Sequence, residues 1–221
     1  MTTTAVNGSE CANRGSTRYC GRAHPTVIGL IVAALVGATG CGRGSGGSAA
    51  TSVSPSDAAS GAIELYDKDG SGALDDSELA ASPGLLAAKS RYDTDGDGRI
   101  SEDEIVARLK SVFGAGSRWL TINCQILKGG RPLAGAKVRF VPEPFFGDAL
   151  QTAAGTTDSQ GRVHPAVDEQ FHPDKLKGRN IMQPGVYRVD VEHPNVTQPH
   201  KPLGFEIDEF ARGGTDAVFN L

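Results

Sequence analysis

The chain has 221 residues, of which 38% are hydrophobic, and a formal net charge of −4, values typical of a soluble protein with one or two folded domains. Its acidic residues are concentrated: residues 54–114 contain 13 acidic and 6 basic side chains, whereas residues 118–221 contain 12 of each. Because a nucleic-acid-binding protein needs a basic face, this distribution argues against a nucleic-acid partner.

The first 41 residues predict export. Arg14, Arg18 and Arg22 precede an apolar run at 27–36, which is too short to span a bilayer comfortably and is followed by small residues. The segment Ala38-Thr39-Gly40-Cys41 resembles the lipobox of bacterial lipoproteins, which implies that Cys41 is lipidated and becomes the new amino terminus. We therefore expect a cell-envelope protein that is lipid-anchored to a membrane and faces the periplasm or the exterior. An ordinary cleaved signal peptide and an uncleaved anchor are the alternatives.

Residues 42–55 are mostly glycine, serine, alanine and threonine, a composition that cannot bury a core and predicts a disordered, flexible linker. The cysteines agree with a signal peptide of residues 1–41. Cys11 and Cys20 would leave with it, and Cys124 would then be the remaining thiol in the folded part, so no intramolecular disulfide is expected. We expect Cys124 to be a buried, inert thiol.

Two segments, Asp67–Glu78 and Asp93–Glu104, repeat one twelve-residue pattern of oxygen-bearing residues. A hard cation of the size of Ca²⁺ binds about six to eight oxygens, and both segments place such groups at positions 1, 3, 5, 9 and 12. The glycine at position 6 stands where the chain must bend sharply, and position 7 contributes a backbone carbonyl. The predicted ligands are Asp67, Asp69, Ser71, Ala73, Asp75 and Glu78 in the first loop, and Asp93, Asp95, Asp97, Arg99, Ser101 and Glu104 in the second.

Both segments match the calcium loop of the EF-hand family. The apolar residues around them follow helical spacing, so residues 56–115 are expected to form an all-α EF-hand pair that binds two Ca²⁺ ions. Leu74 and Ile100, at position 8 of each loop, are expected to face each other in a short two-stranded link. The middle helices are short, and the chain contains only two methionines, which favours a structural or buffering pair over a switch. A calcium-triggered sensor remains an alternative.

From Arg118 onward the hydrophobic period changes to two, as in Leu120, Ile122, Cys124 and Ile126, and glycine turns separate short strands. This pattern predicts an antiparallel β-sandwich over residues 117–221. Three phrases, at 130–138, 157–163 and 184–189, resemble the carboxypeptidase regulatory-like family. The resemblance implies a transthyretin-like sandwich used in scaffolding or adhesion, with no catalytic residues. The predicted fold class is therefore α+β with two domains.

The combined interpretation is a non-enzymatic, calcium-binding envelope lipoprotein whose sandwich binds an unknown protein or polysaccharide partner. Phe113 and Trp119 are close enough in sequence to touch, which would join the two domains. The alternative is an enzyme or carrier that acts on a small ligand in the sandwich loops. A deep pocket lined by His164, His172 and Tyr187 would favour that alternative.

Overall fold

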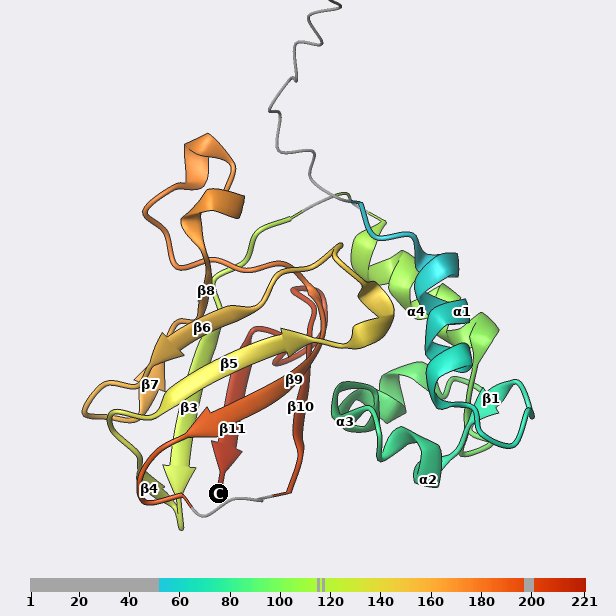
Figure 1. Ribbon diagram of the computed structural model, residues 1–221, viewed down its shortest axis with the longest axis horizontal. Coiled ribbons are helices and arrows are strands. Elements are labelled where there is room, and N and C mark those ends of the chain that lie inside the picture. The colour runs from blue at the N-terminus through green and yellow to red at the C-terminus, as the bar shows by residue number, and fades with distance from the viewer. Residues whose placement is uncertain (1–51, 115, 117, 197–200) are drawn as a thin grey trace, which may run out of the picture. The chain divides into compact units, whose positions relative to one another are not determined.

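A computed structural model describes residues 52–114, 116, 118–196 and 201–221 (Figure 1). The predicted signal peptide, the predicted lipidation site Cys41 and most of the predicted linker lie outside these residues. The described part is a mixed α+β structure of short helices and mainly antiparallel sheets. Within it, no helix is both long enough and apolar enough to cross a membrane.

Residues 52–114 contain four helices and a two-stranded link: α1 (Pro55–Tyr66), β1 (Ala73–Leu74), α2 (Asp76–Leu79), α3 (Pro83–Tyr92), β2 (Ile100–Ser101) and α4 (Glu102–Phe113). The local sequence explains where each helix begins. Proline occupies the first turn of α1 and α3, where a missing N–H has no cost, and α2 and α4 begin with complete capping boxes. The expected link between the loops is present, because β1 and β2 pair antiparallel with Leu74 opposite Ile100.

The described residues of the carboxy-terminal half (118–196 and 201–221) form two sheets. One has the order β10-β9-β5-β6-β8, formed by Leu203–Ile207, Gly185–Glu192, Lys137–Pro142, Ala153–Thr156 and Ala166–Val167. The other has the order β11-β3-β4, with β7 also pairing with β3, formed by Asp216–Asn220, Asn123–Lys128, Arg131–Pro132 and Arg162–Val163. Three 3₁₀ turns lie between strands: η1 (Pro144–Phe146), η2 (Glu169–Phe171) and η3 (Asp174–Leu176).

One strand pairing differs from the expected antiparallel pattern. The last strand, β11, runs parallel to β3, with Ala217 opposite Cys124 and Phe219 opposite Ile126. Alternation along a strand fixes which face is buried but not the direction of its neighbour, so the sequence pattern could not reveal this pairing.

Aromatic rings fill the space between the sheets. Phe140 of β5 contacts Tyr187 of β9 at a centroid distance of 6.2 Å and Phe219 of β11 at 6.4 Å. Cys124 is a buried, free thiol as expected, and burial raises its pKa to about 12. A thiol in this state is a poor nucleophile.

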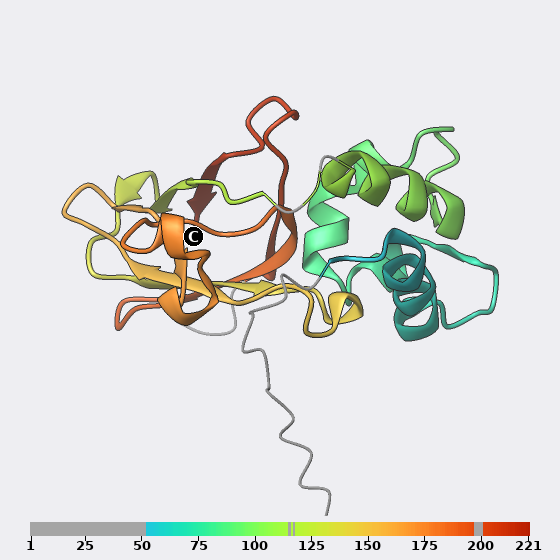
Figure 2. The same cartoon turned by 90° about the horizontal axis from the view of Figure 1, so that it is seen from above.

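Helix α3 lies along β10 and β9, so helices and sheet share one hydrophobic cluster (Figures 1 and 2). The approach is close enough to require glycine. A Cβ atom on Gly204 of β10 would lie 1.9 Å from the carbonyl oxygen of Pro83, and one on Gly84 would lie 2.5 Å from Cγ1 of Val186. The backbones of α3 and β10 are therefore in direct contact.

The expected contact between Phe113 and Trp119 is not the one that forms. Phe113 packs edge-to-face on Phe146 of η1, whereas Trp119 packs on His172, beyond η2. Closeness in sequence does not determine these contacts, because each ring packs against a turn between strands that comes later in the chain.

Candidate metal centre

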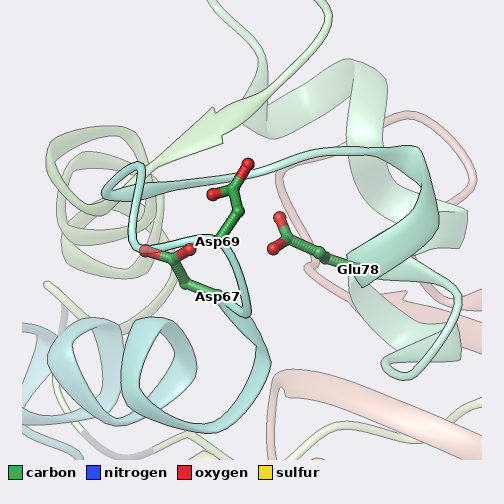
Figure 3. A group of neighbouring side chains, drawn as sticks. All are labelled: Asp67, Asp69 and Glu78. Atoms are coloured by element: carbon green, nitrogen blue, oxygen red, sulfur yellow. The ribbon is translucent and has the colours of Figure 1, made fainter.

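The first loop begins directly after α1, and its first residue, Asp67, organises the turn that follows. The Asp67 carboxylate accepts hydrogen bonds from the backbone N–H groups of Gly70 (2.8 Å), Ser71 (3.2 Å) and Gly72 (2.8 Å). Gly70 and Gly72 have φ values of 73° and 79°, in the left-handed region that glycine adopts readily. This curl brings carboxylate oxygens of Asp67, Asp69 and Glu78 within 4.8 Å of one another (Figure 3).

Glu78 closes the first loop from the first turn of α2. Its side chain is buried, with only 4% of the residue exposed. Oε1 accepts the Lys68 N–H at 2.7 Å, and Oε2 accepts the Asp75 N–H at 3.0 Å. Since these two donors stand at positions 2 and 9 of the loop, they hold the Glu78 carboxylate against the loop that it must close.

The second loop repeats this construction. Asp93 accepts the N–H groups of Gly96 (2.7 Å) and Gly98 (3.1 Å), and carboxylate oxygens of Asp93, Asp95 and Asp97 lie within 4.8 Å of one another. Glu104 is outside that group of three. Its Oε1 accepts the N–H of Thr94 at 2.8 Å and its Oε2 accepts the N–H of Ser101 at 2.9 Å, the same two loop positions that hold Glu78 in the first loop.

The remaining predicted ligands lie in or beside the same two loops. Ser71 Oγ donates to the carbonyl of Ala73 at 2.9 Å, so positions 5 and 7 of the first loop are adjacent. Asp75 and Ser101 cap α2 and α4 with their side-chain oxygens. The Arg99 N–H donates to Asp97 Oδ1 at 2.7 Å. The side-chain ligands are all oxygens, without sulfur or imidazole, which suits a hard cation such as Ca²⁺ or Mg²⁺ rather than Zn²⁺.

Hydrogen bonds favour the ionised form of several of these carboxylates. Hydrogen bonds, first from the N–H of Gly72, lower the pKa of Asp67, and hydrogen bonds, first from the Ser77 hydroxyl, lower the pKa of Asp75. Burial alone would raise the pKa of Glu104, but hydrogen bonds from Ser101 and Thr94 outweigh it and lower the pKa to about 2. A lowered pKa keeps the charged, cation-binding form present to lower pH.

The calcium affinity is therefore expected to be nearly independent of pH in mildly acidic solution. Because the pKa values of Asp67, Asp75 and Glu104 are lowered, protons compete with calcium for these groups only well below pH 5. Calorimetric titrations at pH 7.5 and pH 5.5 should give dissociation constants within about twofold of each other. A tenfold weaker affinity at pH 5.5 would show that an essential ligand takes up a proton in this range.

The residues proposed for a small-ligand site in the sheets are not brought together. His164 lines an open groove of about 470 Å³ on β3, β7 and β11, and its Nδ1 lies 3.1 Å from the carbonyl oxygen of Ile122. His172 is buried against Trp119, and the Tyr187 hydroxyl donates to the carbonyl of Gln183 at 2.9 Å. These three side chains occupy three separate environments.

Sequence reasoning missed a set of buried acidic residues next to the loops. Glu143, Glu206 and Asp208 are each only 2% exposed, and all three belong to the carboxy-terminal half. They contact α1 and α3, the helices that enter the two loops, and α4, the helix that leaves the second loop. Glu206 stands between Phe205 and Ile207, where strand alternation predicts a solvent-facing side chain, so its burial could not be predicted from the local sequence pattern.

A comparison with known families supports the prediction of a calcium loop at residues 93–104. A family model described as EF hand matches residues 90–110, which include the end of α3, the whole second loop and most of α4. No curated protein matches the chain. The geometry of the loops and this match lead to the same conclusion: residues 90–110 are similar to the EF hand, and this similarity indicates calcium binding.

Proposed function

We propose that the protein is a calcium-binding envelope lipoprotein in which an EF-hand pair has a structural role and the sheets act as an interaction module. The observation that carries the calcium assignment is the repetition of one construction in two loops. In each, the aspartate at position 1 accepts the N–H groups of the glycines at positions 4 and 6, and the glutamate at position 12 accepts the N–H groups of positions 2 and 9. Two Ca²⁺ ions, one in each loop, follow from this repetition.

A structural role is supported by what covers the helices. A calcium sensor exposes an apolar groove when its helices separate. Here Ile105 and Leu109 of α4 and Leu85 of α3 are fully buried in the cluster that the helices share with the sheets. Opening the pair would therefore disrupt the fold itself. Outside the cytoplasm calcium is abundant, so affinities of about 10⁻⁴–10⁻³ M are sufficient for a structural site.

Calcium is expected to stabilise the protein against heat. Each site that binds only the folded state contributes about 2.7 kcal/mol when calcium is at 100 times its dissociation constant. In a domain of this size, 1 kcal/mol shifts Tm by about 2–4 °C, so two occupied sites should raise Tm by about 10–20 °C. Differential scanning calorimetry in excess calcium and in excess chelator measures this shift. Equal Tm values in the two conditions would contradict a structural role.

The envelope location rests on the amino-terminal sequence. Residues 1–41 have the pattern of a signal peptide that ends at a lipobox, and residues 42–55 have the composition of a tether. In this proposal Cys41 carries the lipid, and the EF-hand pair (56–115) and the sandwich (117–221) form two domains that face the periplasm or the exterior.

The lipid anchor is expected to depend on Cys41. Wild-type protein should fractionate with membranes and have the additional mass of a lipid at its amino terminus, whereas a Cys41→Ser variant should lack that mass. Mass spectrometry of the purified proteins makes the comparison. An unmodified Cys41 in wild-type protein would leave a cleaved signal peptide or an uncleaved anchor, and the mass of the amino-terminal peptide would distinguish these.

A non-enzymatic role for the sheets is supported by the separation of His164, His172 and Tyr187 described above. The predicted partner of the sandwich is an unknown protein or a polysaccharide, and the near-neutral charge of residues 118–221 does not favour nucleic acid.

A further inference from the structure

Each calcium loop lies in a segment whose two ends are both contacted by one buried glutamate of the carboxy-terminal half. The first of these glutamates is Glu143, which follows β5 and precedes η1. Its Oε2 accepts the Tyr66 hydroxyl at 3.2 Å, and its Oε1 accepts the Gly84 N–H at 2.7 Å. Tyr66 is the last residue of α1 and directly precedes the ligand Asp67, and Gly84 lies in the first turn of α3. One carboxylate thus joins both ends of the segment that contains the first loop.

The second glutamate is Glu206 in β10, whose side chain is completely buried. It accepts hydrogen bonds from Arg91 Nη1 at 2.9 Å and from Arg108 Nε at 3.0 Å and Nη2 at 2.7 Å. Arg91 lies two residues before the ligand Asp93, and Arg108 lies four residues after the ligand Glu104, one turn further along α4. One carboxylate therefore joins both ends of the segment that contains the second loop, and Asp208 adds a contact to Arg108 at 2.8 Å.

These contacts restrict the relative positions of the helices around each loop, and those positions affect calcium binding. In each loop the first ligand is attached to the entering helix, and the glutamate at position 12 belongs to the exiting helix. The relative position of the two helices decides whether both ligands reach the same ion. A group that fixes that position before the ion arrives reduces the ordering that binding requires, and so raises the affinity.

Burial makes both contacts costly to break. Away from water, hydrogen bonds to a carboxylate are stronger, and removing one partner leaves a charged or polar group without compensation. The two contacts differ in chemistry. Glu206 is paired with two arginines, whereas Glu143 is held by a hydroxyl and a backbone N–H, and burial raises the pKa of Glu143. The contact through Glu206 is accordingly the stronger of the two.

We infer that Glu143 and Glu206 are positioning residues for the first and the second calcium site, respectively. Glu206 holds the entering and exiting helices of the second loop from the sheet side. Glu143 holds α1, which enters the first loop, against α3, which follows the exiting helix α2. The sites are thereby preformed, and calcium enters without separating the helices. This inference rests on the proposed calcium-binding function. It also assigns the sheets a direct part in setting calcium affinity, in addition to any partner that they bind.

The test measures each site separately in the full-length protein, purified in detergent. In a Glu104→Gln background only the first site remains, and in a Glu78→Gln background only the second remains. Calorimetry with CaCl₂ is expected to show that Glu143→Gln weakens the first site, and Glu206→Gln the second, by about tenfold, within the range of about 5- to 150-fold that is typical of coupling between sites. The other site should change by less than about twofold.

Three further variants separate positioning from simpler effects. Glu192→Gln removes the same charge from an exposed position of β9, away from the helices, and should leave both sites unchanged. Glu206→Asp keeps the charge but shortens the side chain, and should weaken the second site if contact geometry matters. Tyr66→Phe removes only the hydroxyl that reaches Glu143, so it keeps the first site testable if Glu143→Gln fails to fold.

The possible results are distinguishable. Weakening of the matching site alone supports the inference. Equal weakening of both sites, or no weakening, overturns it, because a general loss of stability or a purely local site would behave in these ways. If neither single-site background binds calcium before Glu143 or Glu206 is changed, it is the proposed function that fails, and the inference fails with it.

Discussion

Replacing Glu78 or Glu104 by glutamine is expected to abolish calcium binding at the corresponding loop and to leave the other loop functional. The change replaces one carboxylate oxygen with an NH₂ group, which repels the ion, and removes one negative charge from the site. Even residues that only support metal ligands are worth about 10- to 100-fold in affinity, so the loss of a ligand should exceed about 100-fold. Calorimetric titration should show one site in each single variant and none in the double variant.

The fold should survive these substitutions. Glutamine at the third helical position still completes a capping box, so α2 and α4 retain their first turns. Asp103→Asn is the matched control, because Asp103 stands next to Glu104, is exposed, and loses the same charge. This control should retain both sites. If Glu104→Gln and Asp103→Asn weakened binding equally, general charge rather than ligation would account for the affinity.

Replacing Arg108 by methionine is expected to destabilise the protein by about 3–5 kcal/mol. Asp208 loses its arginine partner while Glu206 keeps Arg91, so one buried negative charge is left uncompensated. The Arg108 side chain is 17% exposed, and Glu206 and Asp208 are 0% and 3% exposed, so water cannot replace the lost partner. Urea unfolding in the presence of chelator measures this effect without a contribution from calcium.

Arg188→Met provides the comparison. Arg188 also pairs with an acidic residue, Asp190, at 3.0 Å, but its side chain is 47% exposed. An exposed ion pair is worth about 0–1 kcal/mol, so this variant should unfold at nearly the wild-type urea concentration. If the two variants lost similar amounts of unfolding free energy, the cluster around Glu206 would stabilise the protein no more than an exposed ion pair does.

The calcium loops could be predicted in detail from sequence because each position has a local requirement. Asp67 must cap its own turn, Gly72 must adopt a positive φ, and Glu78 must stand in a helical first turn, and these requirements fall within twelve residues. The existence of short strands with glycine turns could be predicted in the same way.

The contacts between the helices and the sheets, and the sheet topology, could not be predicted, because they depend on segments that are distant in the sequence. The burial of Glu206 depends on Arg91 and Arg108, which lie 115 and 98 residues earlier in the chain. The parallel pairing of β11 with β3 and the contact of Trp119 with His172 likewise join segments that are far apart in sequence. Local pattern carries no information about such partners.

The calcium assignment can be tested by a calorimetric titration of the chelator-treated, full-length wild-type protein with CaCl₂. This assignment requires saturation at two calcium ions for each chain, with dissociation constants no weaker than about 10⁻³ M. No binding heat at millimolar calcium, together with an unchanged Tm, would contradict it and would move the search for the protein's function to the sheets alone.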